Sequence, residues 1–293
     1  MKLNLDCSGK GDPTVILDSG GGVPAVGWIK VQPEVAKFAR VCSYDRAGYG
    51  WSEPGPLPRT SLQIARELNA LLAAAGEPGP YVLVGHSFGG FNIRVYTGLY
   101  PRDVVGLVLV DASHEDEEER IQGLLPVAVR KEEKENDEAD EKLDRILTPL
   151  LIHLGIQRLV VARGWNMPTY LSKDLQQELF YLQQQTKHRQ AVEAEGDASS
   201  QSAAQARAAG NLGDRPLIVL TAGKPYEPDP LLTKADMDRQ YNMWINVLQV
   251  EEAHLSTRGR QIVVPDCDHM IPFERPDAVI SAIREVWSAA ARR

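Results

Sequence analysis

The chain has 293 residues, of which 43% are hydrophobic and 25% charged, and its formal net charge is −8. This composition is ordinary for a globular, enzyme-sized chain that builds one large core. The acidic balance argues against a nucleic-acid-binding protein, because Lys and Arg would have to dominate one face of such a protein to meet the phosphate backbone.

The N-terminal residues, MKLNLDCSGKGD, lack the apolar core of a signal peptide, and no apolar run is long enough to span a bilayer. We therefore expect a cytoplasmic protein without a membrane span. The three cysteines, Cys7, Cys42 and Cys267, have no metal-ligand spacing, and an odd number does not describe a disulfide framework. The sequence predicts neither a metal site nor a cofactor, and it leaves the disulfide state open.

Six short apolar segments have the composition of β-strands. Their nearly continuous Val, Ile and Leu content suits parallel strands that are covered on both faces. In chain order they are residues 14–18 (TVILD), 40–45 (RVCSYD), 81–86 (YVLVGH), 104–111 (VVGLVLVD), 216–223 (PLIVLTAG) and 260–266 (RQIVVPD).

Helical segments separate these strands. TSLQIARELNALLAAAG begins with Thr60 and Gln63 at capping-box spacing and ends at Gly76, a residue suited to the position after a helix. FNIRVYTGLYP ends at Pro101, and PDAVISAIREVWSAAARR begins at Pro276, which is tolerated at a helix start. The alternation predicts an α/β fold with an open, mostly parallel sheet flanked by helices.

Residues 113–215 interrupt this alternation. The stretch shows no convincing strand, is rich in Glu, Gln, Lys and Ala, and is too long to be a loop. We interpret it as a helical cap over the carboxyl ends of the strands, inserted before the penultimate strand, with a loosely held exit, EGDASSQSAAQARAAGNLGD. The predicted domains are a core of residues 1–112 and 216–293 and a cap of residues 113–215.

Ser87 stands between glycines where the strand 81–86 ends, in the sequence GHSFG. This fits the pattern G-x-S-x-G, the nucleophile elbow. A serine on so tight a strand-to-helix turn has a strained backbone, and glycines two residues before and after it let the turn close. The turn exposes the hydroxyl at the sheet edge and aims the next helix N-terminus at a developing negative charge.

A serine hydroxyl is a poor nucleophile without a base. His269 follows the last strand and precedes the last helix, so we expect it on a loop above the same sheet edge as Ser87. His86 adjoins the serine and should point elsewhere, as a packed or surface histidine. The remaining four lie in or next to the predicted cap or in a helix, where we expect them to be exposed: His114, His153, His188 and His254.

The carboxylate that orients the histidine should lie between Ser87 and His269 in the chain, at the end of a strand. Asp111 ends the buried strand GLVLVD and is the preferred candidate. The alternatives, Glu227 and Asp229, lie in the loop TAGKPYEPDP after the following strand. A competing role for Asp111 is to cap the first helix of the cap.

Two backbone amides should hold an oxyanion. The residue after the nucleophile, Phe88, supplies one, and the glycine run SGGG directly after the strand 14–18 supplies the other. Backbone without side chains lets a substrate approach closely. Gly21 is the first choice in that run and Gly22 the second. A phosphate-binding role is not favoured, because no Lys-Ser or Lys-Thr pair follows the glycines.

With these motifs the chain resembles the α/β-hydrolase superfamily, in the branch with a serine nucleophile and a helical cap. The motifs that carry the resemblance are VILDSGGG, VCSYDRAGYGWSE, GHSFGG, LVLVDAS and DHMIPFERPDAV. Tyr226 stands where many relatives have the acid, and Asp111 matches relatives that place it before the cap. The chain begins at what resembles the second strand of the family, which leaves a trimmed N-terminus and a lost leader open.

The resemblance implies hydrolysis of a carboxylic ester or related acyl bond of a small molecule through an acyl-serine. Relatives that cleave epoxides or carbon–halogen bonds have Asp at the nucleophile position, so Ser87 argues against both activities. Lactonase, amidase, perhydrolase and carbon–carbon-cleaving activities stay open, as does a binding protein or receptor that keeps the fold. The oligomeric state is also open.

The predicted cap should supply an apolar pocket for the acyl or alcohol group. Six of its residues are best able to line one, although they could equally pack the core of the cap itself: Trp165, Met167, Tyr170, Phe180, Tyr181 and Leu182.

Overall fold

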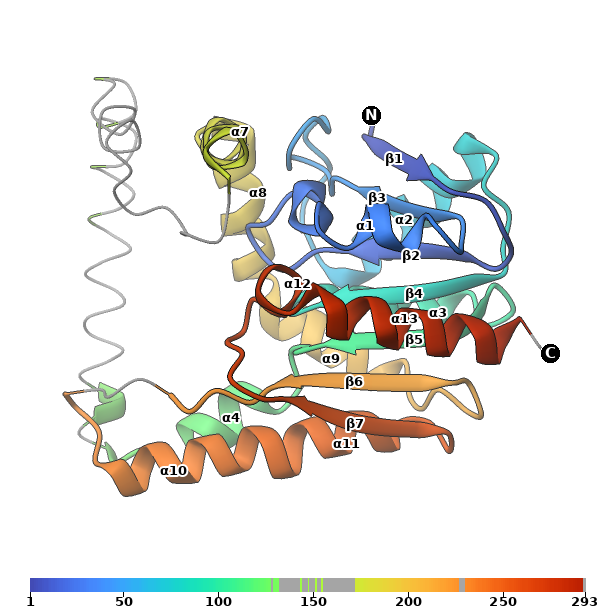
Figure 1. Cartoon of the computed structure of the whole chain (residues 1–293). Helices are drawn as coiled ribbons and strands as arrows, with labels where there is room; N and C mark the ends of the chain where they lie inside the picture. The colour runs from blue at the N-terminus through green and yellow to red at the C-terminus, as the bar shows by residue number, and fades with distance from the viewer. Residues whose placement is uncertain are drawn as a thin grey trace.

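The structure of the protein, a computed structural model, describes residues 1–127, 129–131, 172–226 and 230–291, together with the single positions 143, 147, 151 and 154. In these residues seven strands form one sheet, in the order β1-β3-β2-β4-β5-β6-β7 (Figure 1). Neighbouring strands from β3 to β7 are parallel. Their bounds are β3 (Val41–Tyr44), β2 (Thr14–Asp18), β4 (Tyr81–His86), β5 (Val104–Val110), β6 (Leu217–Ala222) and β7 (Gly259–Val264).

The six strands predicted from the sequence are confirmed, each with its ends within two residues of the expected ones. The additional strand, β1 (Leu5–Ser8), runs antiparallel to β3 at the edge of the sheet. It places Cys7 opposite Cys42, and the two form a disulfide with a Cα–Cα distance of 4.1 Å. Cys267 is a free, buried cysteine.

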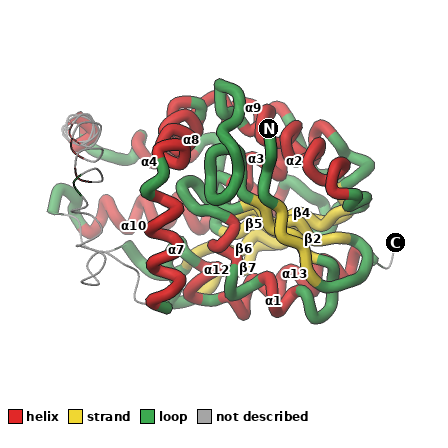
Figure 2. The backbone as a smooth tube through the Cα atoms, turned by 90° about the horizontal axis from the view of Figure 1, so that it is seen from above, coloured by secondary structure: helices red, strands yellow, loops and turns green. Residues whose placement is uncertain are grey.

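Helices cover both faces of the sheet (Figures 1 and 2). Along β2, Val15 and Leu17 face one core cluster and Ile16 faces the other, as the period of two in a strand requires. On the first face lie α1 (Gln32–Val35) and α13 (Pro276–Ala290). On the second lie α2 (Ser61–Ala75), α3 (Gly89–Leu99), α9 (Ser199–Ala208) and α11 (Gln249–His254).

The predicted helix ends are present in α2. The Thr60 side chain accepts a hydrogen bond from the Gln63 amide, and Gly76 ends the helix in the left-handed region at φ 70°. The remaining described helical segments are η1 (Ala25–Trp28), α4 (Glu117–Gln122), α7 (Lys173–Gln183), α8 (Thr186–Asp197), α10 (Lys234–Met243), the π-helical turn η2 (Trp244–Leu248) and α12 (Ile271–Glu274).

The described parts of residues 113–215 are helical, but their exit is not loosely held as expected. Helix α9 packs against α2 and α3, with Ser202 and Ala206 fully buried. Ser202 accepts a hydrogen bond from the Ser61 amide at 3.0 Å, and Arg94 donates to the carbonyl of Ala206. The small Ser and Ala side chains that suggested a loose segment are what lets the helices approach closely. No helix in the described ranges combines the length and apolarity needed to cross a membrane.

Candidate active site

Ser87 occupies the turn between β4 and α3, and its φ of 52° lies in the left-handed region. The flanking glycines are required by packing. A Cβ at Gly85 would lie 2.6 Å from the carbonyl oxygen of Gly89, and one at Gly89 would lie 2.5 Å from the carbonyl oxygen of Asp18. The strain of a non-glycine residue at positive φ is of the kind found at functional sites.

Asp111 and His269 come together at the same edge of the sheet as Ser87. Asp111 directly follows β5, and His269 lies on the loop between β7 and α12. The Nδ1 of His269 lies 2.7 Å from Oδ2 of Asp111. Since an ionised carboxylate can only accept, Nδ1 carries the proton and donates it. This tautomer leaves Nε2 of His269 as the acceptor, the form that a general base needs.

The second carboxylate oxygen of Asp111 is also fixed. It accepts the amide of Ala222 at 2.9 Å and the indole Nε1–H of Trp244 at 3.2 Å. Asp111 is 3% exposed and has φ 41°, so burial, strain and three donors hold one orientation. Trp244 could not be expected here from the sequence pattern, because it enters from the π-helical turn η2.

The electrostatics of His269 favour its protonated form. Burial lowers the pKa of His269, but the hydrogen bond and charge of Asp111 outweigh burial and raise that pKa above its ordinary value of 6.5. His86 behaves in the opposite way: burial and the neighbouring His269 lower the pKa of His86 to about 4. His86 packs its ring 4.8 Å from that of His269, and its Nε2 lies 3.0 Å from the His269 carbonyl oxygen.

If His269 is the general base, as expected from the sequence, these shifts predict the acidic limb of the activity profile. A base must be neutral to accept a proton, so kcat/KM should rise with pH through the pKa of His269 and reach its plateau above that value. We expect the midpoint of this limb above 6.5, because Asp111 stabilises the imidazolium. Steady-state rates on a neutral ester across about pH 5 to 9 measure it. A midpoint below 6.5 would contradict the paired arrangement.

The glycine run after β2 lies against Ser87. A Cβ at Gly20 would lie 3.2 Å from the Ser87 Cβ, and the nearest atom to one at Gly21 is the Phe88 Cβ at 4.0 Å. The amide of Gly22 donates to the Tyr49 hydroxyl at 3.0 Å, so it is occupied. In the described part of the chain, the amides of Gly21 and Phe88 have no protein acceptor. This geometry favours Gly21 over Gly22 as an oxyanion donor.

Ser87, Asp111 and His269 line one cavity of about 320 Å³. Its other described walls are mostly polar: Ser113, Glu117, Ala222, Lys224, Tyr226, Tyr241, Trp244 and Asp268. Tyr226, which stands where relatives have the acid, packs edge-on against Tyr241 at 5.9 Å. The alternative acids, Glu227 and Asp229, lie outside the described residues.

The predicted apolar pocket is not found in this cavity. Trp165, Met167 and Tyr170 lie outside the described residues. Phe180, Tyr181 and Leu182 belong to α7, and none of the three lines the cavity of Ser87. The expectation rests on their apolar character alone, which equally suits the contacts that α7 makes elsewhere.

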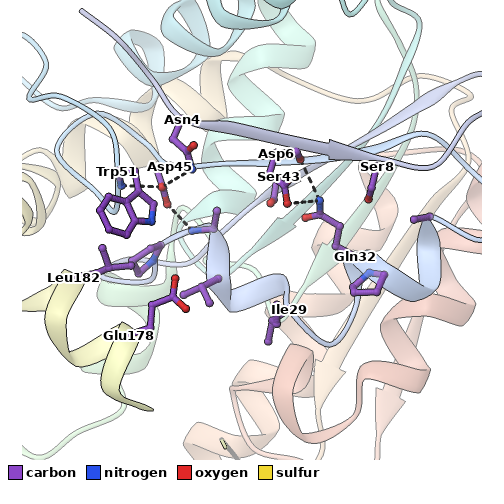
Figure 3. A pocket seen from close by; sticks show the side chains of 15 residues that line it. Asn4, Asp6, Ser8, Ile29, Gln32, Ser43, Asp45, Trp51, Glu178 and Leu182 are labelled. Carbon is purple, nitrogen blue, oxygen red and sulfur yellow. Dashed lines mark hydrogen bonds between the residues drawn. The ribbon is translucent and has the colours of Figure 1, made fainter. Parts of the chain in front are cut away.

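Leu182 instead lines a second cavity, of about 550 Å³, which shares no residue with the first. Figure 3 shows Trp51 and Leu182 at one end of it and Gln32 and Ser8 at the other. The Asp45 carboxylate in its wall accepts bonds from the Ala25 and Trp51 amides and from the Asn4 side chain. Tyr181 packs beside Trp51, with ring centroids 6.2 Å apart.

Two of the histidines expected to be exposed are buried. His114 is 7% exposed, and its Nδ1 accepts the Asp116 amide. His188 is 4% exposed and packs edge-on against Tyr49. Their polar neighbours in the sequence suggested a solvated face, but the segments carrying them pack against the core. His254 is exposed in α11, and His153 lies outside the described residues.

Several groups of described residues have metal-ligand spacing, but most of their ligand atoms already have protein partners. Cys7 and Cys42 are joined in the disulfide. Around His114, the carboxylates of Glu115 and Glu252 both pair with Arg94, at 2.5 and 2.7 Å. None of these groups contains a residue that lines the cavity of Ser87 and His269.

Comparisons with known proteins concern the family and fold of the chain. The sequence profile described as "Alpha/beta hydrolase family" matches residues 15–282. The uncharacterized protein YqjL of Bacillus subtilis (strain 168) is 25% identical over 285 residues, which cover 97% of this chain and 87% of that protein. Other curated relatives are much longer: the chain spans 16% of "Probable transporter efuK" of Hormonema carpetanum and 20% of an uncharacterized vacuolar membrane protein of Saccharomyces cerevisiae.

Solved structures agree on the fold. Cfl2 from Burkholderia cenocepacia superimposes with a TM-score of 0.65 at 19% identity, covering 97% of this chain and 92% of that one. A thermophilic esterase from Thermogutta terrifontis gives a TM-score of 0.59 at 21% identity, covering 98% and 93%. The epoxide hydrolase CorEH gives 0.64 at 18%, covering 98% and 95%. At these identities the likeness concerns the fold alone.

Proposed function

Because this chain belongs to the alpha/beta hydrolase family, we propose that it is a serine hydrolase that cleaves a carboxylic ester, or a related acyl bond, through an acyl-serine intermediate. One observation carries the proposal. Asp111 holds the Nδ1–H of His269 at 2.7 Å, in a cavity that Ser87 also lines from a strained turn. Nucleophile, base and orienting carboxylate are thus three side chains at one sheet edge.

The steps follow from these positions. The Ser87 Oγ attacks the ester carbonyl carbon while Nε2 of His269 takes the hydroxyl proton. The amides of Phe88 and Gly21 stabilise the carbonyl oxygen as it becomes negative. The tetrahedral intermediate then expels the alcohol, which leaves with the proton from His269. Water attacks the acyl-serine with the same base, and collapse of the second tetrahedral intermediate releases the carboxylic acid.

The identity of the nucleophile separates this proposal from epoxide cleavage. The fold is shared with an epoxide hydrolase, so the fold does not choose between the two reactions. Relatives that open epoxides attack with a carboxylate at the elbow, and this chain has the hydroxyl of Ser87 there. A hydroxyl suits attack on an acyl carbon, where the oxyanion amides assist the charge that develops.

The walls of the cavity favour a small, polar acyl substrate. Glu117, Lys224, Tyr226 and Tyr241 are among its lining residues. Burial raises the pKa of Glu117, a carboxyl in the wall of this cavity. A volume of about 320 Å³ fits a compact molecule at the low end of ordinary ligand sites.

Covalent labelling tests the proposal directly. We expect a sulfonyl fluoride to label the protein once, at Ser87, and to abolish hydrolysis of p-nitrophenyl esters in proportion to the label, since only the activated serine reacts. Mass spectrometry of the intact protein and of its peptides gives the number and the site of the labels. The rate of p-nitrophenyl ester hydrolysis gives the loss of activity. Ser113, which lines the same cavity, is the internal control and should stay unmodified.

Label at Ser113 or elsewhere would contradict the assignment of the nucleophile. A protein that neither reacts with the reagent nor hydrolyses any ester in the panel would contradict the proposed function itself and leave a binding protein on the same fold.

A further inference from the structure

Glu195 is a buried carboxylate with an unusual position. It lies in the last turn of α8 and is 3% exposed. A negative charge there opposes the partial negative charge at a helix C-terminus and loses its hydration, so the position is unfavourable unless the carboxylate is paired. Both of its oxygens are paired, with the guanidinium of Arg46 and the hydroxyl of Tyr49, which follow β3 far away in the sequence.

Arg46 connects this carboxylate to the glycine run beside Ser87. Its Nε and Nη2 donate to the two oxygens of Glu195, each at 2.9 Å. The remaining donors bind the Asp18 carboxylate at 2.9 Å and the carbonyl oxygens of Ser19 at 2.5 Å and Gly20 at 3.0 Å. All five N–H groups of the guanidinium are therefore used, and two of them hold the backbone that leads into Gly21.

Tyr49 holds the other side of the same run. Its hydroxyl donates to Glu195 at 2.7 Å and accepts the amide of Gly22 at 3.0 Å. Tyr49 is 1% exposed, and Arg46 stacks over its ring at 4.6 Å. The carbonyls before Gly21 and the amide after it are thus bound by two side chains that meet on one carboxylate.

Helix α8 is itself fastened to the core next to this network. Lys187 donates to the carbonyl oxygens of Gly50 and Ser52, each at 2.7 Å. Gly48 packs so closely on α8 that a Cβ there would lie 2.5 Å from the Cβ of Ala191. Helix α8, which carries Glu195, is therefore held to the core both by Lys187 and Ala191 and by Glu195 itself.

We propose that Glu195 is a positioning residue for the oxyanion site: through Arg46 and Tyr49 it fixes the Gly20–Gly22 backbone so that the amide of Gly21 faces the substrate oxygen. Helix α8 then serves as a fixed support of the catalytic machinery. The inference rests on the proposed function, because it uses Gly21 as a donor to the oxyanion. An amide fixed before reaction stabilises the developing charge without reorganisation, which is where such donors gain their effect.

Glu195→Gln tests the inference with the smallest change in shape. The NH2 group of the new amide must face either Arg46 or Tyr49, both of which donate to Glu195. One of these two hydrogen bonds is therefore lost. We expect kcat for p-nitrophenyl ester hydrolysis to fall about 10- to 100-fold, since a slight displacement of one donor has effects of this size. KM should change less than about threefold, and the acidic limb should not move, because Asp111 and His269 are untouched.

Two further variants make the result specific. Tyr49→Phe removes the bonds of this hydroxyl to the Gly22 amide and to Glu195 but leaves Arg46 paired with Glu195, so it should give a smaller loss of kcat. The double variant should lose less than the product of the two losses, because both changes act on one segment. Glu67→Gln is the matched control. Glu67 is a buried carboxylate whose hydrogen bonds within the described residues go to Arg59, at 2.7 Å, and to Gln63, away from the glycine run, so its replacement should leave kcat unchanged.

Thermal unfolding of each variant and the final extent of Ser87 labelling complete the test. The inference is supported by a folded Glu195→Gln protein that labels fully but turns over slowly. It is overturned by wild-type kcat in that variant, or by losses that follow the folded fraction and appear equally in Glu67→Gln; the proposed function stands in both cases. A wild-type protein without labelling or ester hydrolysis instead overturns the proposed function, and the inference with it.

Discussion

Replacing Asp111 with asparagine is expected to lower kcat for ester hydrolysis by about 10⁴-fold. The fold should survive, because the amide oxygen can still accept the bonds from the Ala222 amide and the Trp244 indole. The amide nitrogen would then face Nδ1 of His269 as a donor. This favours the tautomer with the proton on Nε2, which cannot accept a proton from Ser87. Steady-state kinetics and circular dichroism of the variant measure loss and fold.

The other candidate acids supply the comparison. Glu227→Gln and Asp229→Asn should each cost less than about tenfold in kcat, since the bond from His269 to Asp111 then still controls the tautomer. An inactive Glu227→Gln variant together with an active Asp111→Asn variant would assign the orienting carboxylate to the loop after β6. Asp111 would then only support the backbone between β5 and α4.

The sheet could be predicted because its signal is local. In β2, β4 and β5 a run of Val, Ile and Leu buried on both faces is bounded by polar or glycine residues, and each predicted segment matches the observed strand. Strand β1 escaped prediction because LDCS is short, half-exposed and pairs only on one side, with β3. An edge strand of this kind carries no periodic pattern that distinguishes it from a loop.

The candidate site was predictable where topology alone brings residues together. Parallel strands end at one edge, so Ser87 after β4, Asp111 after β5 and His269 after β7 had to be neighbours once the strands were placed. Their catalytic roles remain predictions. Trp244 and Glu195 could not be found in this way, because each reaches the site from a helix whose rotation and packing the sequence pattern does not specify.

In the segment predicted to form a cap, the sequence suggested exposure for residues that are buried. The polar residues of α8 indicated a solvated face, yet His188 and Glu195 are buried against the loop after β3. Polar residues on a helix are exposed by default, and they become buried only when a partner neutralises them. The partner here is Arg46 in the motif YDRAGYG, which lies 149 residues away. No local pattern connects the two positions.

The largest effect is expected from Ser87→Ala, which should lower kcat by about 10⁶-fold. The change removes the only atom that can form the acyl intermediate and leaves the backbone strain nearly as it is, because Ser and Ala both carry a Cβ at φ 52°. Binding of a substrate analogue, measured by calorimetry, should persist, since the cavity walls are unchanged. Ser200→Ala, on the exposed side of α9, is the control and should keep wild-type kcat.

The double variant of Ser87 and His269 separates a catalytic unit from two independent contributions. If His269 acts by taking the proton of Ser87, it has nothing to do once the hydroxyl is gone, so Ser87→Ala with His269→Ala should be no slower than Ser87→Ala alone. Losses that multiply would show that His269 assists by another route, for example by contacting substrate. Wild-type turnover in Ser87→Ala would remove the acyl-serine from the mechanism altogether, whatever the geometry of Asp111 and His269.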